Sequence, residues 1–204
     1  MRHGATEWSV AGRHTGRTDM ALTVDGVAQA HAAAAVIEMV VCDVVPPSPG
    51  IDAVFTSPLQ RARATAEIVF GGAPLQADDD LMEFDYGSYE GRTSADIRTE
   101  APDWDIWRDG CPDGETPGAV GERCDRFLGR AQAAGLVVAV VAHGHLLRIL
   151  AARAVGLPAA EGRIFTLDTA TISVLEDVRG VRVVKLWNFD PAFFQRPTAA
   201  VRRN

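Results

Sequence analysis

The chain has 204 residues, of which 47% are hydrophobic, and its net charge is −7. That length can bury one sizeable core, so we expect a single domain over residues 1–204. The acidic balance argues against nucleic-acid or membrane-surface partners, which require basic excess, and the longest strongly apolar run, residues 136–142, is too short to cross a bilayer. We therefore expect a soluble, cytoplasmic protein in which any anion site is local.

The first third of the chain predicts two helices around a buried strand. Thr23 is a typical N-cap, and apolar residues then recur at helical spacing at positions 27, 30, 34, 37 and 41. A proline-rich loop at 46–50 precedes a strand at 51–56, which is apolar enough to be buried. Ser57 and Pro58 are a strong helix-start signal, and Arg61 falls in the first turn of the second helix. The expected inward stripe of that helix is Leu59, Ala62, Ala66 and Val69.

The middle of the chain, residues 71–118, is mostly irregular. We expect a loop over 71–80, an acidic and aromatic segment without a clean period over 81–91, and a short helix over 93–100. An irregular stretch with Trp104 and Trp107 follows over 101–114. Loops of that length tend to be functional, and we expect residues 71–118 to form part of a cap over an active site.

The last third predicts an alternation of helices and strands. Thr116 and Pro117 begin a helix that ends at Gly135, and the apolar residues 136–141 suit a strand covered on both faces. A helix over 145–155 follows. Residues 171–175 and 181–186 are expected to pair as a hairpin, and residues 190–204 to form a weakly ordered tail. Strands that alternate with helices indicate a layered α/β fold.

Basic residues follow two of the expected strands directly. Arg61 lies just beyond the strand at 51–56, and His143 follows the strand at 136–141. Because ligands of open parallel sheets bind beyond the carboxyl ends of the strands, these side chains are expected to share one rim. If His3 also lies at the end of a strand, then Arg2, His3, Arg61 and His143 form a cationic pocket suited to a phosphoryl group.

Four motifs occur in order along the chain. They are Arg2-His3-Gly4, the segment SPLQRARATA at 57–66, Glu83 three residues before Tyr86-Gly87, and Ala142-His143-Gly144. Together they resemble the histidine phosphatase superfamily, which includes phosphoglycerate mutases and many phosphatases. Further segments, at 6–9, 15–16, 85–91, 107–111 and 143–145, resemble the branch that contains fungal sedoheptulose bisphosphatase and actinobacterial acid phosphatases.

The resemblance implies a three-layer α/β/α fold of the phosphoglycerate mutase type, with a mostly parallel central sheet. It also implies that His3 attacks phosphorus and forms a phosphohistidine, for which its imidazole must be neutral. Arg2, Arg61 and, when protonated, His143 favour that neutral form by like charge, and they stabilise the transferring phosphoryl group without a metal or any other cofactor. Glu83 matches the position that protonates the leaving group and then activates water.

The same resemblance assigns substrate contacts. Ser9, Thr15, Gly16, Tyr86 and Gly144 are expected to bind the substrate. Ser9 stands where many members of the superfamily have asparagine. The serine is typical of the branch with sedoheptulose bisphosphatase and acid phosphatases.

Three other histidines are weaker candidates. We expect them to be mainly structural; His14 is a candidate for lining the mouth of the pocket, and His145 is a candidate only for supporting His143. His31 is expected to be an ordinary helix residue.

Other chemistries fit the sequence less well. Cys124 and Arg130 have the spacing of cysteine phosphatases, but they lie inside a helical stripe. The acidic run at 78–80 is expected to be a solvated loop, and three cysteines without metal-ligand spacing predict neither a disulfide nor a metal site. The chain has no nucleotide-binding glycine motif.

We therefore expect a metal-independent phosphatase that hydrolyses small phosphomonoesters, such as sugar phosphates, and releases inorganic phosphate. A phosphoglycerate mutase-type phosphotransferase is the first alternative. A catalytically impaired protein that binds phosphorylated ligands is the second. A homodimer is possible.

The position of the first motif raises one further expectation. Only Met1 precedes Arg2, whereas the resemblance implies a central strand of several apolar residues there. We expect that the start codon was assigned too late and that the first strand is missing from this chain, which would leave His3 on an unanchored terminus. A genuine short form is the alternative, and an in-frame stop codon directly upstream would favour it.

Overall fold

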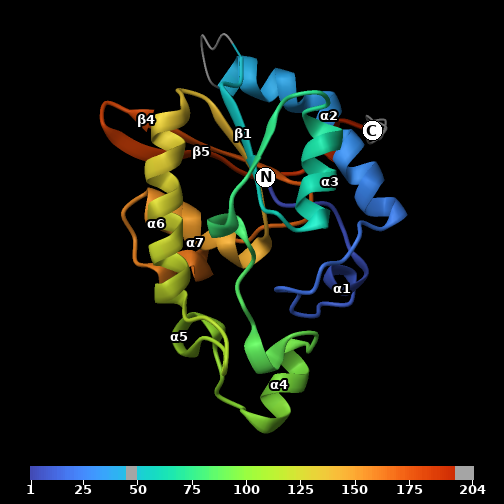
Figure 1. Ribbon diagram of the computed structural model, residues 1–204, viewed down its shortest axis with the longest axis vertical. Helices are drawn as coiled ribbons and strands as arrows, with labels where there is room; N and C mark the ends of the chain where they lie inside the picture. The colour runs from blue at the N-terminus through green and yellow to red at the C-terminus, as the bar shows by residue number, and fades with distance from the viewer. Residues whose placement is uncertain (45–49, 196–204) are drawn as a thin grey trace, which may run out of the picture.

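The computed structural model describes residues 1–44 and 50–195, and its centre is a parallel sheet flanked by helices (Figure 1). The strands are β1 (Ala53–Thr56), β2 (Leu75–Ala77) and β3 (Val138–Val141), in the order β2-β1-β3. Helices α2 (Val24–Val44) and α3 (Gln60–Val69) lie on one side, and α6 (Pro117–Ala134) and α7 (Gly144–Ala154) on the other. This arrangement is the expected α/β fold.

The two faces of the sheet pack against different helices because side chains alternate along a strand. Phe55 of β1 meets Phe127 of α6 in an edge-on contact with ring centroids 5.4 Å apart. Val141 of β3 packs instead against Ala62 and Ala66 of α3. All four residues of β1 are buried, as the apolar sequence predicted. In β3 only Val141 is fully buried, so the prediction that both faces are covered is wrong for the other three residues.

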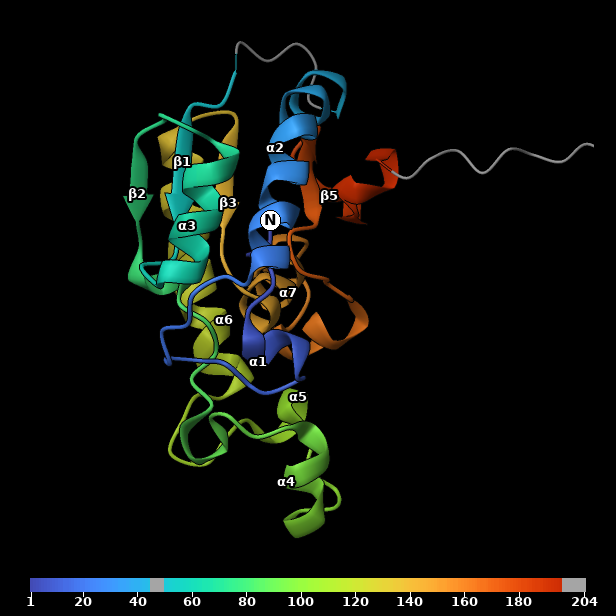
Figure 2. The same cartoon turned by 90° about the vertical axis from the view of Figure 1, so that its right-hand side faces the viewer.

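A separate antiparallel hairpin lies beyond the free edge of β3. It consists of β4 (Ile172–Val178) and β5 (Val181–Phe189), and it confirms the hairpin predicted from residues 171–175 and 181–186. Figure 2 shows the parallel strands on the left and β5 on the right. An apolar cavity of about 620 Å³ lies between them, with Val138, Val140 and Val174 in its lining. The open edge beside this cavity explains the partial exposure of β3.

The first three residues are anchored at one end of that open edge. The α-amino group of Met1 donates to the carbonyl of Val140 (2.9 Å), and the amide of His3 donates to that of Ala142 (2.9 Å). The amide of Ala170 donates to the carbonyl of His3 (3.0 Å) from the opposite side. The expectation that His3 lies on an unanchored terminus is therefore wrong, because backbone hydrogen bonds hold it from two directions.

The segment between β2 and α6 descends from the middle of the molecule, and its helices, α4 (Ser94–Glu100) and α5 (Ile106–Asp109), lie in the lower part of Figure 1. It also contains 3₁₀ turns at Asp79–Leu81 and Gly87–Tyr89. The predicted helix over 93–100 is confirmed, because the side chains of Thr93 and Asp96 form a capping box. Loop was expected at β2 and irregular chain at α5. Both elements are short, and the pattern of side chains along the sequence does not reveal their backbone hydrogen bonds.

Several boundaries differ from those predicted. The buried face of α2 is Ala30, Ala33, Val36 and Val40, rotated by about one residue from the predicted stripe. Helix α3 begins at Gln60 without a side-chain cap, because the hydroxyl of Ser57 accepts instead from the amide of Leu59 (3.3 Å). The predicted inward stripe of α3 is nevertheless buried.

Two predicted irregular segments are only partly described. The predicted loop at 46–50 falls mostly outside the described residues. In the predicted weakly ordered tail, Pro191–Gln195 form a 3₁₀ turn, and residues 196–204 lie outside the described part.

Helix α2 is also long and apolar enough, by length and composition alone, to cross a membrane. This helix contains no long continuous apolar run, because polar residues interrupt it, so the longest apolar run of the sequence lies elsewhere. In this fold one side of the helix packs in a core with Val69 of α3 and Ile172 of β4. That packing is the behaviour of a core helix.

Two short elements complete the fold. Helix α1 (Glu7–Val10) directly follows the first motif, and a 3₁₀ segment at Ala159–Ile164 packs behind α7.

Candidate active site

The four basic residues predicted to share a pocket lie together at the carboxyl ends of β1 and β3. The ring centroids of His3 and His143 are 5.1 Å apart, and Nε of Arg61 lies 3.2 Å from Nδ1 of His143. Arg2 pairs with Ala142 in a parallel bridge, which places its side chain beside Gly144. The sheet thus brings residues from three distant parts of the chain to one rim.

His3 is arranged as a neutral imidazole with one free nitrogen. Its Nδ1 lies 2.7 Å from the carbonyl oxygen of Gly4, which can only accept, so Nδ1 carries the proton. The lone pair is therefore on Nε2. Burial first, and then the charges of Arg2 and Arg61, lower the pKa of His3 well below 6.5. A buried, unprotonated Nε2 is the form that a nucleophilic histidine requires.

His143 faces the site as a hydrogen-bond donor. Arg61 donates from Nε to Nδ1 of His143, so the imidazole proton must be on Nε2. Burial, followed by the charges of Arg61, His3 and Arg2, lowers the pKa of His143 well below 6.5. His143 is therefore neutral here, and the expected cationic contribution from its protonated form is absent. Its Nε2 is buried and has no protein partner among the described residues.

Arg2 supplies a second buried donor without a partner. Its Nη1 donates to the carbonyl of Leu167 (2.6 Å), whereas its Nε has no acceptor within the described part of the chain. A Cβ placed on Gly144 would lie 3.4 Å from Nε and Cζ of Arg2, so the absence of a side chain there keeps this donor accessible. Buried donors without acceptors are rare, and two beside the unprotonated nitrogen of His3 indicate an anion site.

Arg61 is fully buried and mostly occupied by the protein. Besides its bond to His143, Nη1 donates to the carbonyl of Thr18 (2.8 Å), and Nη2 donates to those of Thr15 (3.0 Å) and Gly16 (2.9 Å). Four of its five N–H groups are thus directed at protein acceptors. Arg61 contributes its charge to the site, and it also holds the loop at 15–18 in place.

The carboxylate of Glu83 lies at the N-terminus of α7. Its Oε1 accepts from the amides of Leu146 (2.8 Å) and Phe84 (2.9 Å), and its Oε2 accepts from the amide of His145 (3.1 Å). Two of these amides belong to the first turn of α7, where helix donors lack internal partners. Glu83 therefore also caps the helix that follows His143, which fixes both groups relative to one another.

The predicted substrate contacts are engaged within the protein in different ways. The hydroxyl of Ser9 caps α1 through Thr6, and that of Thr15 donates to the carbonyl of Arg13 (3.1 Å). The amide of Gly16 donates to the carboxylate of Glu90 (2.9 Å). The substrate contacts assigned to these three residues therefore stay predictions, as does that of Gly144.

Tyr86 belongs to a group of aromatic and imidazole side chains beside the site, and its predicted substrate contact stays a prediction. Its hydroxyl lies 2.7 Å from Nδ1 of His145, and its ring is 4.7 Å from that of His14. Trp107 contacts His145, with centroids 5.1 Å apart, and Arg148 stacks over Trp107 at 4.3 Å. The histidines near the motifs are a sequence signal from which this group could have been found. Arg148 has no such signal, because it occupies an ordinary helix position outside the motifs.

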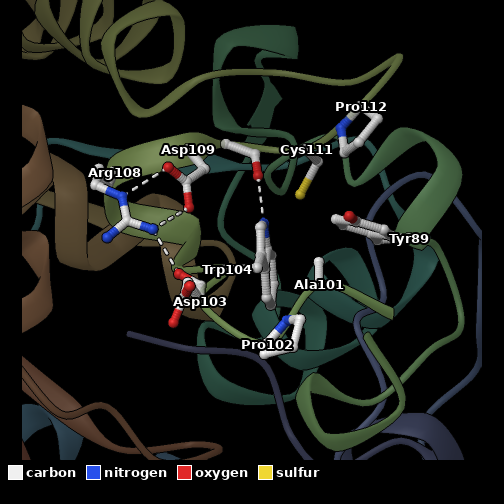
Figure 3. Close-up of a pocket in the computed structure, with 10 residues that line it drawn as sticks. Tyr89, Ala101, Pro102, Asp103, Trp104, Arg108, Asp109, Cys111 and Pro112 are labelled. Carbon is white, nitrogen blue, oxygen red and sulfur yellow. Dashed lines mark hydrogen bonds and ion pairs between the residues drawn. The ribbon is translucent and has the colours of Figure 1, made fainter. Parts of the chain in front are cut away.

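Figure 3 shows a separate open hollow of about 520 Å³ in the middle segment of the chain. Trp104 lies across it and donates from Nε1 to the carbonyl of Gly110 (2.8 Å), and Arg108 pairs with Asp109 (2.7 Å). Its lining includes none of the basic site residues. The catalytic chemistry is therefore not assigned to this hollow.

Acidic side chains at the predicted solvated run are paired with arginines. Asp78 binds Arg130 (2.9 Å), and Asp80 binds Arg126 (2.6 Å). Within residues 1–44 and 50–195, no group of three or more histidine, cysteine or acidic residues is arranged to hold a metal ion.

Comparisons with known proteins agree with this geometry. A model of the histidine phosphatase superfamily (branch 1) matches residues 1–190. The chain is 39% identical over 185 residues to an acid phosphatase of Mycobacterium tuberculosis, covering 89% of this chain and 87% of that protein. It is 37% identical over 185 residues to a sedoheptulose 1,7-bisphosphatase of Saccharomyces cerevisiae, covering 77% and 66%.

A solved structure has the same fold. The product of the Rv3214 open reading frame of Mycobacterium tuberculosis superposes with a TM-score of 0.84 at 36% identity, covering 93% of this chain and 95% of that one. The chain belongs to the histidine phosphatase superfamily, and it is an enzyme of the phosphatase and phosphoglycerate mutase-like type. The expected family and fold class are both confirmed.

Proposed function

We propose that this enzyme hydrolyses small phosphomonoesters, with sugar phosphates as the substrate class, through a phosphohistidine intermediate on His3. One observation carries the proposal. The unprotonated Nε2 of His3 faces a site where two buried donors, Nε of Arg2 and Nε2 of His143, have no protein acceptor. A phosphoryl group would satisfy both donors while its phosphorus lies before the nucleophile.

The proposed reaction has two steps. In the first, Nε2 of His3 forms a bond to phosphorus, the bond from phosphorus to the ester oxygen breaks, and Glu83 gives that oxygen a proton. In the second, Glu83 takes a proton from water, whose oxygen attacks the phosphohistidine and releases inorganic phosphate. Arg2, His143 and the charge of Arg61 stabilise the transferring group, so the proposed mechanism needs no metal.

The assignment of sugar phosphates rests on the relatives and on the rim of the site. One relative is named a sedoheptulose 1,7-bisphosphatase. We further propose that residues 71–118 contribute a cap over the substrate. The supporting contact is that of Trp104, which lies edge-on to the ring of His14 with centroids 5.7 Å apart, while His14 also contacts Tyr86. Aromatic and imidazole groups of this kind suit the apolar faces and hydroxyls of a sugar.

The test is a rapid-quench experiment with a ³²P-labelled sugar phosphate in the presence of EDTA. The expected result is transient, acid-labile label on the wild-type protein, followed by inorganic phosphate, and no label on His3→Ala. Binding of phosphate without any labelled protein would contradict the proposal and would favour a phospholigand-binding protein. Positional transfer on 3-phosphoglycerate without net phosphate release would favour a mutase.

A further inference from the structure

Arg123, a buried arginine of α6, binds the backbone of the loop that carries Glu83. Arg123 is only 5% exposed, and its guanidinium donates to three carbonyls of one loop. Nη1 donates to the carbonyls of Asp80 (2.7 Å) and Met82 (2.5 Å), and Nη2 donates to that of Glu83 itself (3.1 Å). Three bonds from one planar group fix the path of the chain directly before the Glu83 side chain.

The other side of the same guanidinium binds Glu115. Its Nε and Nη2 donate to the two carboxylate oxygens of Glu115, at 2.8 and 3.0 Å. Glu115 then holds the chain beyond Glu83, because its Oε2 accepts from the amide of Asp85 (2.8 Å) and its own amide donates to the carbonyl of Asp85 (2.9 Å). Arg123 and Glu115 thus clamp the loop on both sides of Glu83.

All five N–H groups of Arg123 are used in this clamp. A lysine has three donors on a single nitrogen and cannot reach a carboxylate and three carbonyls together. The Glu83 carboxylate is held separately by amides of α7. Helix α6 therefore fixes the position of the Glu83 backbone, and α7 fixes the position of its carboxylate oxygens. Arg123 therefore holds the loop of Glu83 in one position, in addition to filling space in the core.

We propose that Arg123, acting through Glu115 and the loop at 80–85, is a positioning residue for the proton transfer by Glu83. This inference rests on the proposed function, in which Glu83 protonates the leaving group. Arg123 does not touch the phosphoryl site. Its loss therefore weakens proton transfer to the leaving oxygen while phosphoryl binding by Arg2 and His143 is retained.

The test compares two substrates that differ in their need for an acid. An alkyl phosphate such as glycerol 3-phosphate requires protonation of its leaving oxygen, whereas p-nitrophenolate is a weak base and leaves without it. We expect Arg123→Lys to lower kcat/KM for glycerol 3-phosphate by about 100-fold, the cost of a misplacement of about 1 Å. The value for p-nitrophenyl phosphate should fall much less, and inhibition by inorganic phosphate should be unchanged.

Two further variants sharpen the comparison. Arg126→Met removes an exposed arginine of the same helix that binds the Asp80 side chain instead of its carbonyl, and it should leave both substrates unaffected. Glu115→Gln keeps the size of the partner and should reproduce the substrate-dependent loss if Arg123→Lys folds poorly. In a Glu83→Gln background, Arg123→Lys should add no further loss on glycerol 3-phosphate.

The outcomes separate the inference from the function on which it depends. Equal losses on the two substrates, in both clamp variants, would mean that Arg123 has only a structural role and would overturn the inference. Unchanged turnover of glycerol 3-phosphate would do the same. If the wild type hydrolyses neither substrate, while His3→Ala behaves identically, the proposed function fails and the inference fails with it.

Discussion

The backbones of Gly4 and Gly26 approach so closely that a Cβ on Gly4 would lie 2.3 Å from the carbonyl oxygen of Gly26. A Cβ on Gly26 would likewise lie 2.1 Å from the carbonyl oxygen of Ala5. This contact seats the segment after His3 against the first turn of α2. The opposing atoms are backbone atoms, which cannot rotate away as a flexible side chain can.

Gly26→Ala should therefore lower the free energy of unfolding by about 3 kcal/mol, the upper range for overpacking, and should reduce activity by displacing His3. Gly129→Ala is the matched control, because it lies within helix α6 with no atom near its Cβ position. That variant should gain about 0.5–1 kcal/mol. Urea denaturation followed by circular dichroism measures the free energy of unfolding of both variants. An unchanged value for Gly26→Ala would show that the two backbones can separate freely.

Loss of Arg61 should affect stability as well as catalysis. Arg61→Met leaves the carbonyls of Thr15, Gly16 and Thr18 without their donor, at a cost of about 1–3 kcal/mol for each group that water cannot reach. We expect a total loss of at least about 3 kcal/mol in urea denaturation, together with weaker binding of inorganic phosphate.

Arg63→Met is the control for Arg61, because Arg63 lies in the same helix. Among the residues that the structure describes, its one ion pair is exposed, with Glu67 at 3.8 Å. Its removal should change the stability by less than about 0.5 kcal/mol. Equal stabilities of the two variants would contradict the role of Arg61 in holding the loop at 15–18.

Buried histidines should make the protein less stable in acid. Burial, and then the charge of Arg98, lower the pKa of His14 from 6.5 to about 4. The unfolded chain binds this proton more readily than the folded one, so the contribution of His14 is complete above pH 6.5 and is lost as the pH falls from 6.5 towards 4. At full extent it amounts to about 3 kcal/mol.

His14→Gln should therefore reduce the dependence of the unfolding free energy on pH by about 1.4 kcal/mol per pH unit within that window. His31→Gln, at an exposed position in α2, is the matched control. Urea titrations at several pH values between 4 and 7.5 measure how the unfolding free energy depends on pH. Identical slopes for wild type and His14→Gln would show that His14 is protonated in the folded protein.

Replacement of the proposed acid should separate binding from turnover. We expect Glu83→Gln to slow hydrolysis of glycerol 3-phosphate by about 10²- to 10⁴-fold, the usual effect of losing a general acid. The inhibition constant of inorganic phosphate should change little, because Arg2 and His143 are untouched. Steady-state rates with and without phosphate provide both numbers, and wild-type rates on the alkyl phosphate would reject Glu83 as the acid.

The family, the layered α/β class and most helices could be predicted from the order of the amino acids alone. These are local or motif-level properties: apolar spacing located α2, α3 and α6, and the residues around His3 and His143 carried the resemblance. The side chains of Thr93 and Thr116 also fixed the starts of α4 and α6, because a cap is a contact between near neighbours in the chain.

Which side chains direct donors into the site, and which hold the surrounding loops, depends on the folded arrangement of the chain. Arg61 was predicted as a direct ligand, yet most of its donors bind loop carbonyls. Arg123 belongs to none of the motifs, yet it clamps the loop of Glu83. The imidazole tautomers of His3 and His143 were equally hidden. Each depends on a partner brought close by folding of the whole chain, and side-chain patterns along the sequence carry no record of such long-range hydrogen bonds.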